Sequence, residues 1–140
     1  MKALYLESSA IVAWLLGEGP AADVIRAMNQ AEVRVTSALT TVEAERAIQR
    51  AVVKRIVKEA MAHKLRGVLE RERASWITMS LTAGVLARAG RAFPVEPVRT
   101  LDAIHLATAL AFSEAFPELA ILALDRRVSA NAIALGLTVA

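Results

Sequence analysis

Four carboxylates stand at boundaries between predicted strands and helices, where they could act together in chemistry. Glu7 and Asp125 each follow a short apolar run. Glu43 and Asp102 lie in the first turns of predicted helices. Because such helix starts and strand ends can share one edge of a sheet, the four side chains could meet in one pocket. Clustered carboxylates repel one another, and a divalent cation with oxygen-only ligands, Mg²⁺ or Mn²⁺, would relieve that repulsion.

Each acid also has a purely structural explanation. In "TTVE", Glu43 would complete a capping box. Asp102 follows a predicted Thr100 cap and would face the positive end of a helix. Asp125 would be an N-cap, and Glu7 would be a solvated residue of a turn. The apolar neighbours of Glu7 argue against this last explanation, because an unpaired charge is costly to bury.

The apolar pattern predicts the elements that would position these acids. Short strands are expected at residues 3–6, 33–36, 76–79 and 119–123, with a fifth at 137–139. Helices are expected at residues 8–16, 21–29, 80–90, 100–113 and 126–135, and from 40 to about 73 with a break near 55–57. Short apolar strands that alternate with helices predict an α/β fold, a three-layer domain with a short parallel central sheet flanked by helices.

Composition restricts the class of protein. The 140 residues fit one domain, with 56% hydrophobic residues and charges spread throughout. No apolar run is long enough for a membrane span, and the chain has no cysteine to form a disulfide or a thiolate metal site. We therefore expect a soluble, cytoplasmic protein. The net charge of +3 and the pI near 9.8 favour a polyanionic partner.

Four segments carry a family resemblance. In chain order they are "YLESSAIVAWLLGE", "SALTTVEAERAI", "RTLDAIHLATAL" and "LALDRRVSANAIALGL". The first resembles the opening strand–Asp–Ser–Ser–Ala segment of PIN-domain ribonucleases of the VapC toxin type. The second resembles their segment with the central Glu, the third is the best match, and the last resembles their closing strand–Asp–Arg–Arg–helix segment. The resemblance spans essentially the whole chain and implies a single PIN domain over residues 1–140.

The resemblance also implies a function. It implies a Mg²⁺- or Mn²⁺-dependent endoribonuclease, the toxin of a type II toxin–antitoxin pair, which hydrolyses RNA phosphodiester bonds. Glu7 and Asp102 would be the principal metal ligands, while Glu43 and Asp125 would bind through water or hold a second ion. An antitoxin that blocks the site and a homodimer are further implied. Apolar helix faces near residues 11–16 and 85–86 are candidates for either contact. The catalytic and metal-binding set is then Glu7, Glu43, Asp102 and Asp125.

Two residues depart from the family pattern. The first acid of the family is usually Asp, and Glu7 is one methylene longer, at most about 1.5 Å of extra reach. Ala123 stands where Thr or Ser is common, two residues before the last acid. One alternative is therefore a catalytically weakened or silent PIN domain that binds antitoxin or RNA without efficient cleavage. A second is a different metal-dependent hydrolase, such as a phosphatase, on a similar scaffold.

Basic residues lie beside two of the candidate acids. Three recur at helical spacing after Glu43, a row that would reach Lys58 on an unbroken helix, and two directly follow Asp125. Without the four candidate acids, 10 acidic residues remain against 17 basic ones, so the rest of the surface would be positive. This suits an RNA backbone, and a solvated helix face is the alternative. The predicted RNA-binding residues are Arg46, Arg50, Lys54, Arg126 and Arg127.

The two histidines give a weaker signal. His105 lies three residues after Asp102, on the same face of its predicted helix. It would orient a carboxylate or contact the substrate, and simple packing near the helix start is the alternative. His63 lies on a charged helix and is expected at the surface.

Overall fold

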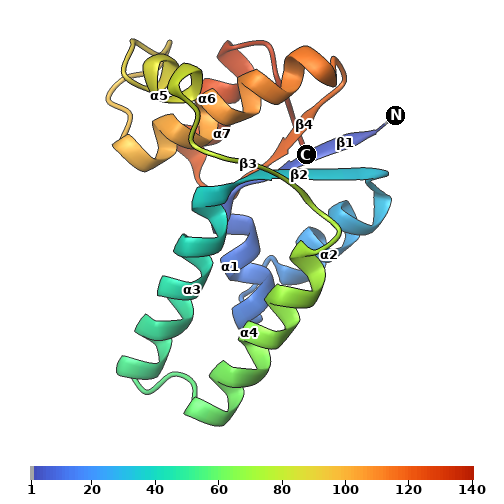
Figure 1. Cartoon of the computed structure of the whole chain (residues 1–140), viewed down its shortest axis with the longest axis vertical. Coiled ribbons are helices and arrows are strands. Elements are labelled where there is room, and N and C mark those ends of the chain that lie inside the picture. Colours follow the sequence, from blue (N-terminus) through green and yellow to red (C-terminus); the bar gives the residue numbers. More distant parts are fainter. Residues whose placement is uncertain (1) are drawn as a thin grey trace.

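Strands and helices alternate along the chain in the computed structural model, which describes residues 2–140 (Figure 1). The strands are β1 (Ala3–Leu6), β2 (Val33–Ser37), β3 (Ile77–Met79), β4 (Ala120–Leu122) and β5 (Thr138–Val139). The helices are α1 (Ser8–Leu16), α2 (Ala21–Gln30), α3 (Ala38–Val53), α4 (Glu59–Arg73), α5 (Ala83–Ala89), α6 (Thr100–Ala115) and α7 (Arg126–Ala134).

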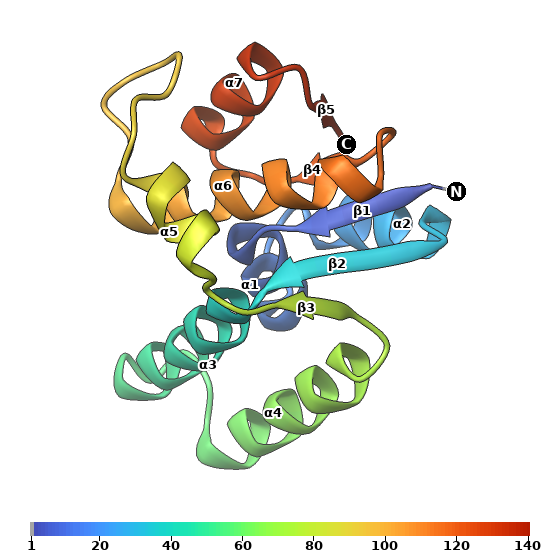
Figure 2. The same cartoon turned by 45° about the horizontal axis from the view of Figure 1, so that its top comes forward.

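The strands form one parallel sheet in the order β3-β2-β1-β4-β5. The side chains of the central strand β1 alternate between the two faces, as the two-residue period of a strand requires. Leu4 and Leu6 join the core formed with α1 to α4, whereas Ala3 and Tyr5 join the core formed with α6 and α7. In Figure 2 the arrowheads of β1 and β2 point to the same side, where α3 begins. The predicted three-layer fold with a short parallel sheet is confirmed.

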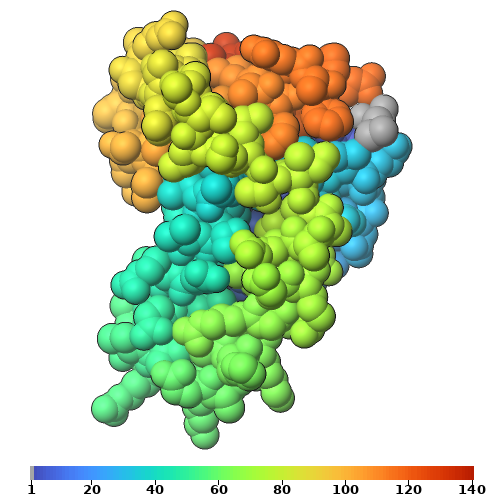
Figure 3. Space-filling model, in the orientation of Figure 1, coloured from blue at the N-terminus to red at the C-terminus, as the bar shows by residue number. Residues whose placement is uncertain are grey.

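Helices α3 and α4 form an antiparallel pair that extends away from the sheet and packs against α1 (Figure 1, Figure 3). The predicted break between them is confirmed. Lys54 is the C-cap of α3, Arg55 adopts a left-handed conformation with φ of 59°, and α4 begins at Glu59. Lys58 is therefore the N-cap of α4 and does not extend the basic row along α3.

The start of α3 differs from the prediction. The helix begins at Ala38, because the Ser37 side chain accepts a hydrogen bond from the amide of Leu39 at 3.1 Å. The predicted capping box at residues 40–43 is thus wrong, and Glu43 lies in the second turn. Helix α6 begins at Thr100 as predicted, but its N-cap is Arg99 and no side chain caps it.

The apolar helix faces considered for protein contacts differ in exposure. Ile11, Ala13 and Leu15 of α1 are buried, so most of that face is already used inside the molecule. On α5, Val85 is buried and Leu86 is exposed. No helix within residues 2–140 has the length and apolar character that a membrane crossing requires.

Candidate active site

Glu7 connects the end of β1 to the start of α1 and is almost completely buried, with 3% of its surface exposed. Its backbone amide donates to the carbonyl of Leu122 at the end of β4, at 3.1 Å. One carboxylate oxygen, Oε1, accepts from the Ser8 hydroxyl at 2.8 Å. The other, Oε2, accepts from the Ser9 amide at 3.0 Å and from the Ser9 hydroxyl. Glu7 is therefore the N-cap of α1, and the interpretation as a solvated turn residue is wrong.

Glu43 approaches Glu7 across a buried imidazole. Nε2 of His105, on α6, lies 2.5 Å from Oε1 of Glu43, on α3, and 3.8 Å from Oε1 of Glu7. Nδ1 of the same ring lies 2.8 Å from the hydroxyl of Tyr5, on β1. Burial raises the pKa of Tyr5 well above its ordinary value, and the negative charge of Glu7 raises it further. His105 thus links three elements of the fold at the carboxyl end of β1.

Asp102 and Asp125 are joined by an arginine that bonds to both of them. Nε of Arg99 lies 3.1 Å from Oδ2 of Asp102, and its NH2 nitrogen lies 3.2 Å from Oδ2 of Asp125. The hydrogen bond to Asp102, followed by the charges of both carboxylates, raises the pKa of Arg99. Oδ1 of Asp125 accepts from the amides of Arg127 and Val128 at 2.9 and 3.1 Å, so its predicted role as the N-cap of α7 is confirmed.

A cleft of about 290 Å³ connects the two pairs of acids. Glu43 and Asp102 line it together with Arg99, Thr100 and Leu101. Glu7 and Asp125 are not among its lining residues. The structure therefore places Asp102 and Asp125 on one arginine and Glu43 and Glu7 beside one histidine, and one member of each pair lines the cleft.

The cleft offers two carboxylates, which suits a divalent cation that keeps most of its water ligands better than one coordinated entirely by protein side chains. Within residues 2–140, no group of three or more His, Cys, Asp or Glu side chains is arranged to hold a metal ion. Oε2 of Glu43 and Oδ1 of Asp102 have no hydrogen-bond partner among those residues, and both carboxylates line the cleft. Mg²⁺ usually keeps several of its waters and binds through one or two carboxylates.

The predicted RNA-binding residues are exposed, and none forms an ion pair within residues 2–140. Arg46, Arg50 and Lys54 follow Glu43 along α3, which leads away from the sheet (Figure 1). At 1.5 Å per residue, the row extends about 16 Å from Glu43 to Lys54. The other two, at residues 126–127, open α7 directly after Asp125.

Sequence reasoning missed two residues of this site. Arg99 precedes Asp102 by three residues, and that helical spacing was the available signal. Tyr5 gave no local signal, because its contact with His105 spans 100 residues of sequence.

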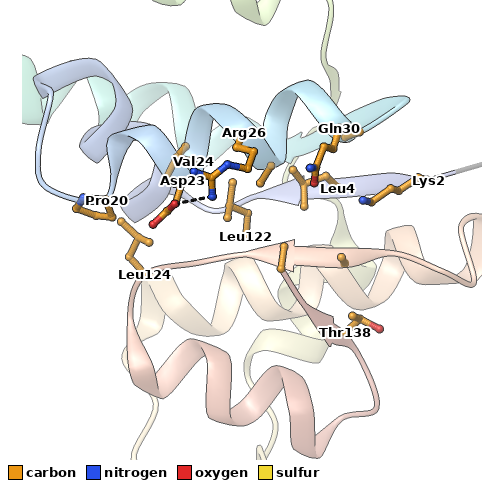
Figure 4. Close-up of a pocket in the computed structure, with 14 residues that line it drawn as sticks. Lys2, Leu4, Pro20, Asp23, Val24, Arg26, Gln30, Leu122, Leu124 and Thr138 are labelled. Atoms are coloured by element: carbon orange, nitrogen blue, oxygen red, sulfur yellow. Dashed lines mark hydrogen bonds and ion pairs between the residues drawn. The ribbon is translucent and has the colours of Figure 1, made fainter.

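A second concave surface, which we call the α2–β4 groove, has a volume of about 560 Å³ and lies between α2 and the strands β1, β4 and β5 (Figure 4). Its floor is apolar and includes Leu4, Leu122 and Leu124. An ion pair of 2.8 Å between Asp23 and Arg26 lies at its side. None of the four candidate acids lines this groove, so it is separate from the cleft of the active site.

Comparison with known proteins agrees with the fold and gives the family. Residues 4–134 match the PIN domain family, and the chain belongs to that family. Over 112 residues it is 38% identical to Ribonuclease VapC46 of Mycobacterium tuberculosis, an alignment that covers 78% of this chain and 75% of that protein. The predicted assignment to the PIN domains of the VapC toxin type is thereby confirmed.

Two solved structures share the fold. VapC20 of Mycobacterium tuberculosis, a toxin that cleaves the sarcin–ricin loop, matches with a TM-score of 0.64 and 16% identity over 91% of this chain and 93% of that chain. VapBC2 from Rickettsia felis, bound to a DNA fragment from their promoter, matches with a TM-score of 0.66 and 8% identity over 99% and 97%. At these identities the likeness concerns the fold alone.

Proposed function

We propose that this protein is a metal-dependent endoribonuclease, the toxin component of a type II toxin–antitoxin system that acts in the cytoplasm. One observation carries the proposal: Glu43 and Asp102 line a single cleft, and a residue that contacts each of them also lies beside a further acid. The 38% identical relative is a ribonuclease, which supports RNA as the substrate.

The residues of the cleft would divide the work of phosphodiester hydrolysis. Glu43 and Asp102, which line the cleft, would hold Mg²⁺ or Mn²⁺, in place of the pair Glu7 and Asp102 that the resemblance implies. Glu7 and Asp125 would add negative charge next to them. When bound, the divalent cation supplies Lewis acidity that activates water and neutralises charge on the phosphate. The Arg99 guanidinium, 67% exposed and at the cleft wall, is placed to contact a phosphate oxygen of the substrate.

The basic residues would hold the rest of the RNA strand. Phosphate contacts by exposed Lys and Arg position a nucleic acid without reading its sequence. The row that begins at Arg46 extends this contact from the cleft along α3, and the two arginines that open α7 extend it on the other side. Affinity for RNA should therefore fall steeply as salt concentration rises.

Two protein partners complete the proposal. A homodimer is one, and the exposed Leu86 of α5 is available for that contact. An antitoxin is the other, since a structural neighbour is a VapBC complex. The α2–β4 groove offers an apolar floor to which an amphipathic antitoxin segment would bind.

A PIN domain with weakened cleavage is the second candidate function, and Glu7 favours it. Both oxygens of this longer side chain are hydrogen-bonded to Ser8 and Ser9, and neither faces the cleft. Ala123 is buried and supplies no hydroxyl. If cleavage is weak for this reason, Glu7→Asp should accelerate it, because the shorter side chain restores the usual residue of the family.

The proposal is tested by cleavage of total RNA by the purified protein with Mn²⁺, with Mg²⁺ and with EDTA. We expect discrete RNA fragments with either metal and none with EDTA. Cleavage in EDTA would contradict the metal requirement. Turnover of a small phosphate ester without cleavage of RNA would instead favour a phosphatase.

A further inference from the structure

His105 is fully buried, and each of its ring nitrogens contacts an oxygen of another side chain. It has no role in the hydrolysis proposed for the cleft. Nδ1 lies 2.8 Å from the Tyr5 hydroxyl and Nε2 lies 2.5 Å from Oε1 of Glu43. The rings of Tyr5 and His105 meet edge to face, with centroids 6.1 Å apart and planes at 74°. Strand β1 and helices α6 and α3 therefore converge on one imidazole directly behind the cleft.

Hydrogen-bond chemistry assigns the protons of this contact. A carboxylate only accepts hydrogen bonds, so Nε2 of His105 donates to Glu43. The Tyr5 hydroxyl carries a hydrogen and lies within hydrogen-bond distance of Nδ1. A neutral imidazole with its hydrogen on Nε2 satisfies both contacts, because its Nδ1 is then an acceptor.

We propose that Tyr5 and His105 form a positioning relay for Glu43. The Tyr5 hydroxyl donates to Nδ1 and holds the orientation of the His105 ring, and Nε2 donates to the carboxylate of Glu43 and fixes it at the wall of the cleft. This leaves Oε2 of Glu43 for the divalent cation, so the relay rests on the proposed function. Because Nε2 also lies 3.8 Å from Oε1 of Glu7, the ring sets the separation of the two carboxylates. Neither relay residue lines the cleft, so both act through Glu43.

Two substitutions of His105 separate positioning from packing. The side-chain amide of Gln reaches the place of Nε2 and can donate to Glu43, whereas the amide of Asn ends near the place of Nδ1. Loss of a residue that orients a metal ligand typically weakens metal binding about 10- to 100-fold. We expect a loss of this size for Mn²⁺ in H105N, measured by isothermal titration calorimetry, and recovery of most of the affinity in H105Q.

Tyr5→Phe is the milder test, because it removes one oxygen and keeps the aromatic ring. We expect it to weaken Mn²⁺ binding about tenfold, at the lower end of the range for such residues. A residue with a role in packing alone would leave the Mn²⁺ affinity of the folded variant unchanged. Thermal unfolding establishes that each variant is folded. If the His105 variants do not fold, the Mn²⁺ affinity of Tyr5→Phe distinguishes positioning from packing.

The tautomer itself can be read in the metal-free protein by two-bond ¹H–¹⁵N correlation NMR of the imidazoles. His63, the other histidine of the chain, is exposed and serves as the internal reference for a solvated ring. We expect a protonated Nε2 and an unprotonated Nδ1 at His105, and in Tyr5→Phe a shift of the Nδ1 resonance because its hydrogen bond is lost.

The possible outcomes distinguish the relay from the proposed function. A hydrogen on Nδ1 of the wild-type His105 would overturn the relay, as would an unchanged Mn²⁺ affinity in H105N. A wild-type protein that binds no Mn²⁺ and cleaves no RNA would contradict the proposed function. The Nδ1 resonance of His105, compared between the wild type and Tyr5→Phe without metal, would still decide whether Tyr5 donates to His105.

Discussion

Asp125 has two roles in this structure, and a pair of substitutions separates them. Oδ1 caps α7 through two backbone amides, and Oδ2 accepts from Arg99. Asn is as good an N-cap as Asp, so D125N keeps the cap and loses the charge. The pair with Arg99 is largely exposed, at 67% and 29% for the two side chains, and such pairs contribute about 0–1 kcal/mol. We therefore expect D125N to lose less than about 1 kcal/mol of unfolding free energy.

D125A loses the cap as well as the charge. Loss of a capping side chain costs typically about 1 kcal/mol, which lowers the midpoint of thermal unfolding by roughly 2–5 °C in a chain of this size. If the charge of Asp125 supports the metal, both variants should lose RNA cleavage to the same extent, about 10- to 100-fold. Urea unfolding and cleavage of RNA in Mn²⁺ measure the two quantities on the same preparations.

A capping residue far from the acids provides the matched control. The Thr82 hydroxyl accepts from the amide of Val85 at 3.1 Å and caps α5. T82A should lose a similar unfolding free energy, about 1 kcal/mol, and keep wild-type cleavage. Wild-type cleavage by D125N would refute the reasoning, because Asp125 would then act only as a helix cap.

Three further predictions concern the basic row, Tyr5 and the α2–β4 groove. Arg50→Ala should lower the slope of log affinity for RNA against log salt concentration by about one, whereas Lys2→Ala, at the opposite end of β1, should leave it unchanged. Because the folded-state pKa of Tyr5 is raised, the contribution of this residue to stability is complete below about pH 10 and is lost as the pH rises further. Tyr5 is the one tyrosine of the sequence, so tyrosinate absorbance reports its ionisation. Ionisation of Tyr5 in the folded protein near pH 10 would contradict the prediction. Ala27→Arg should fill the groove and abolish binding of the proposed antitoxin partner, while Asn29→Arg on the same helix should not, as a pull-down would show.

The order of elements was predictable because strands such as β1 and β4 are short apolar runs and helices such as α1 and α7 have a clear signal at one end. Strand β1 and helix α1 have the predicted bounds. Gly17 ends α1 because its left-handed conformation, with φ of 66°, favours glycine. The start of α3 was not predictable from composition alone, since two hydroxyl residues compete for the cap. The hydroxyl of Thr40 is buried and bonded to that of Thr36 at 2.7 Å, which leaves Ser37 to cap the helix.

The sequence was sufficient to predict which acids belong to the candidate site, but not how they are arranged in space. The positions of Glu7, Asp102 and Asp125 at the ends of elements follow from local sequence. Which acids face a common cleft depends on the relative placement of α3 and α6, and no local pattern encodes it. The bridging role of His105 depends in addition on Tyr5, which approaches from the centre of the sheet.

RNA cleavage by Asp102→Asn tests the central claim most directly. The substitution keeps the size of a residue that lines the cleft and removes its charge. Glu114→Gln, an exposed residue of the same helix, is purified in parallel as the control for contaminating ribonuclease. With Mn²⁺ present, we predict that D102N loses cleavage by at least about a hundredfold and that E114Q cleaves like the wild type. Equal cleavage by D102N and the wild type would contradict the account.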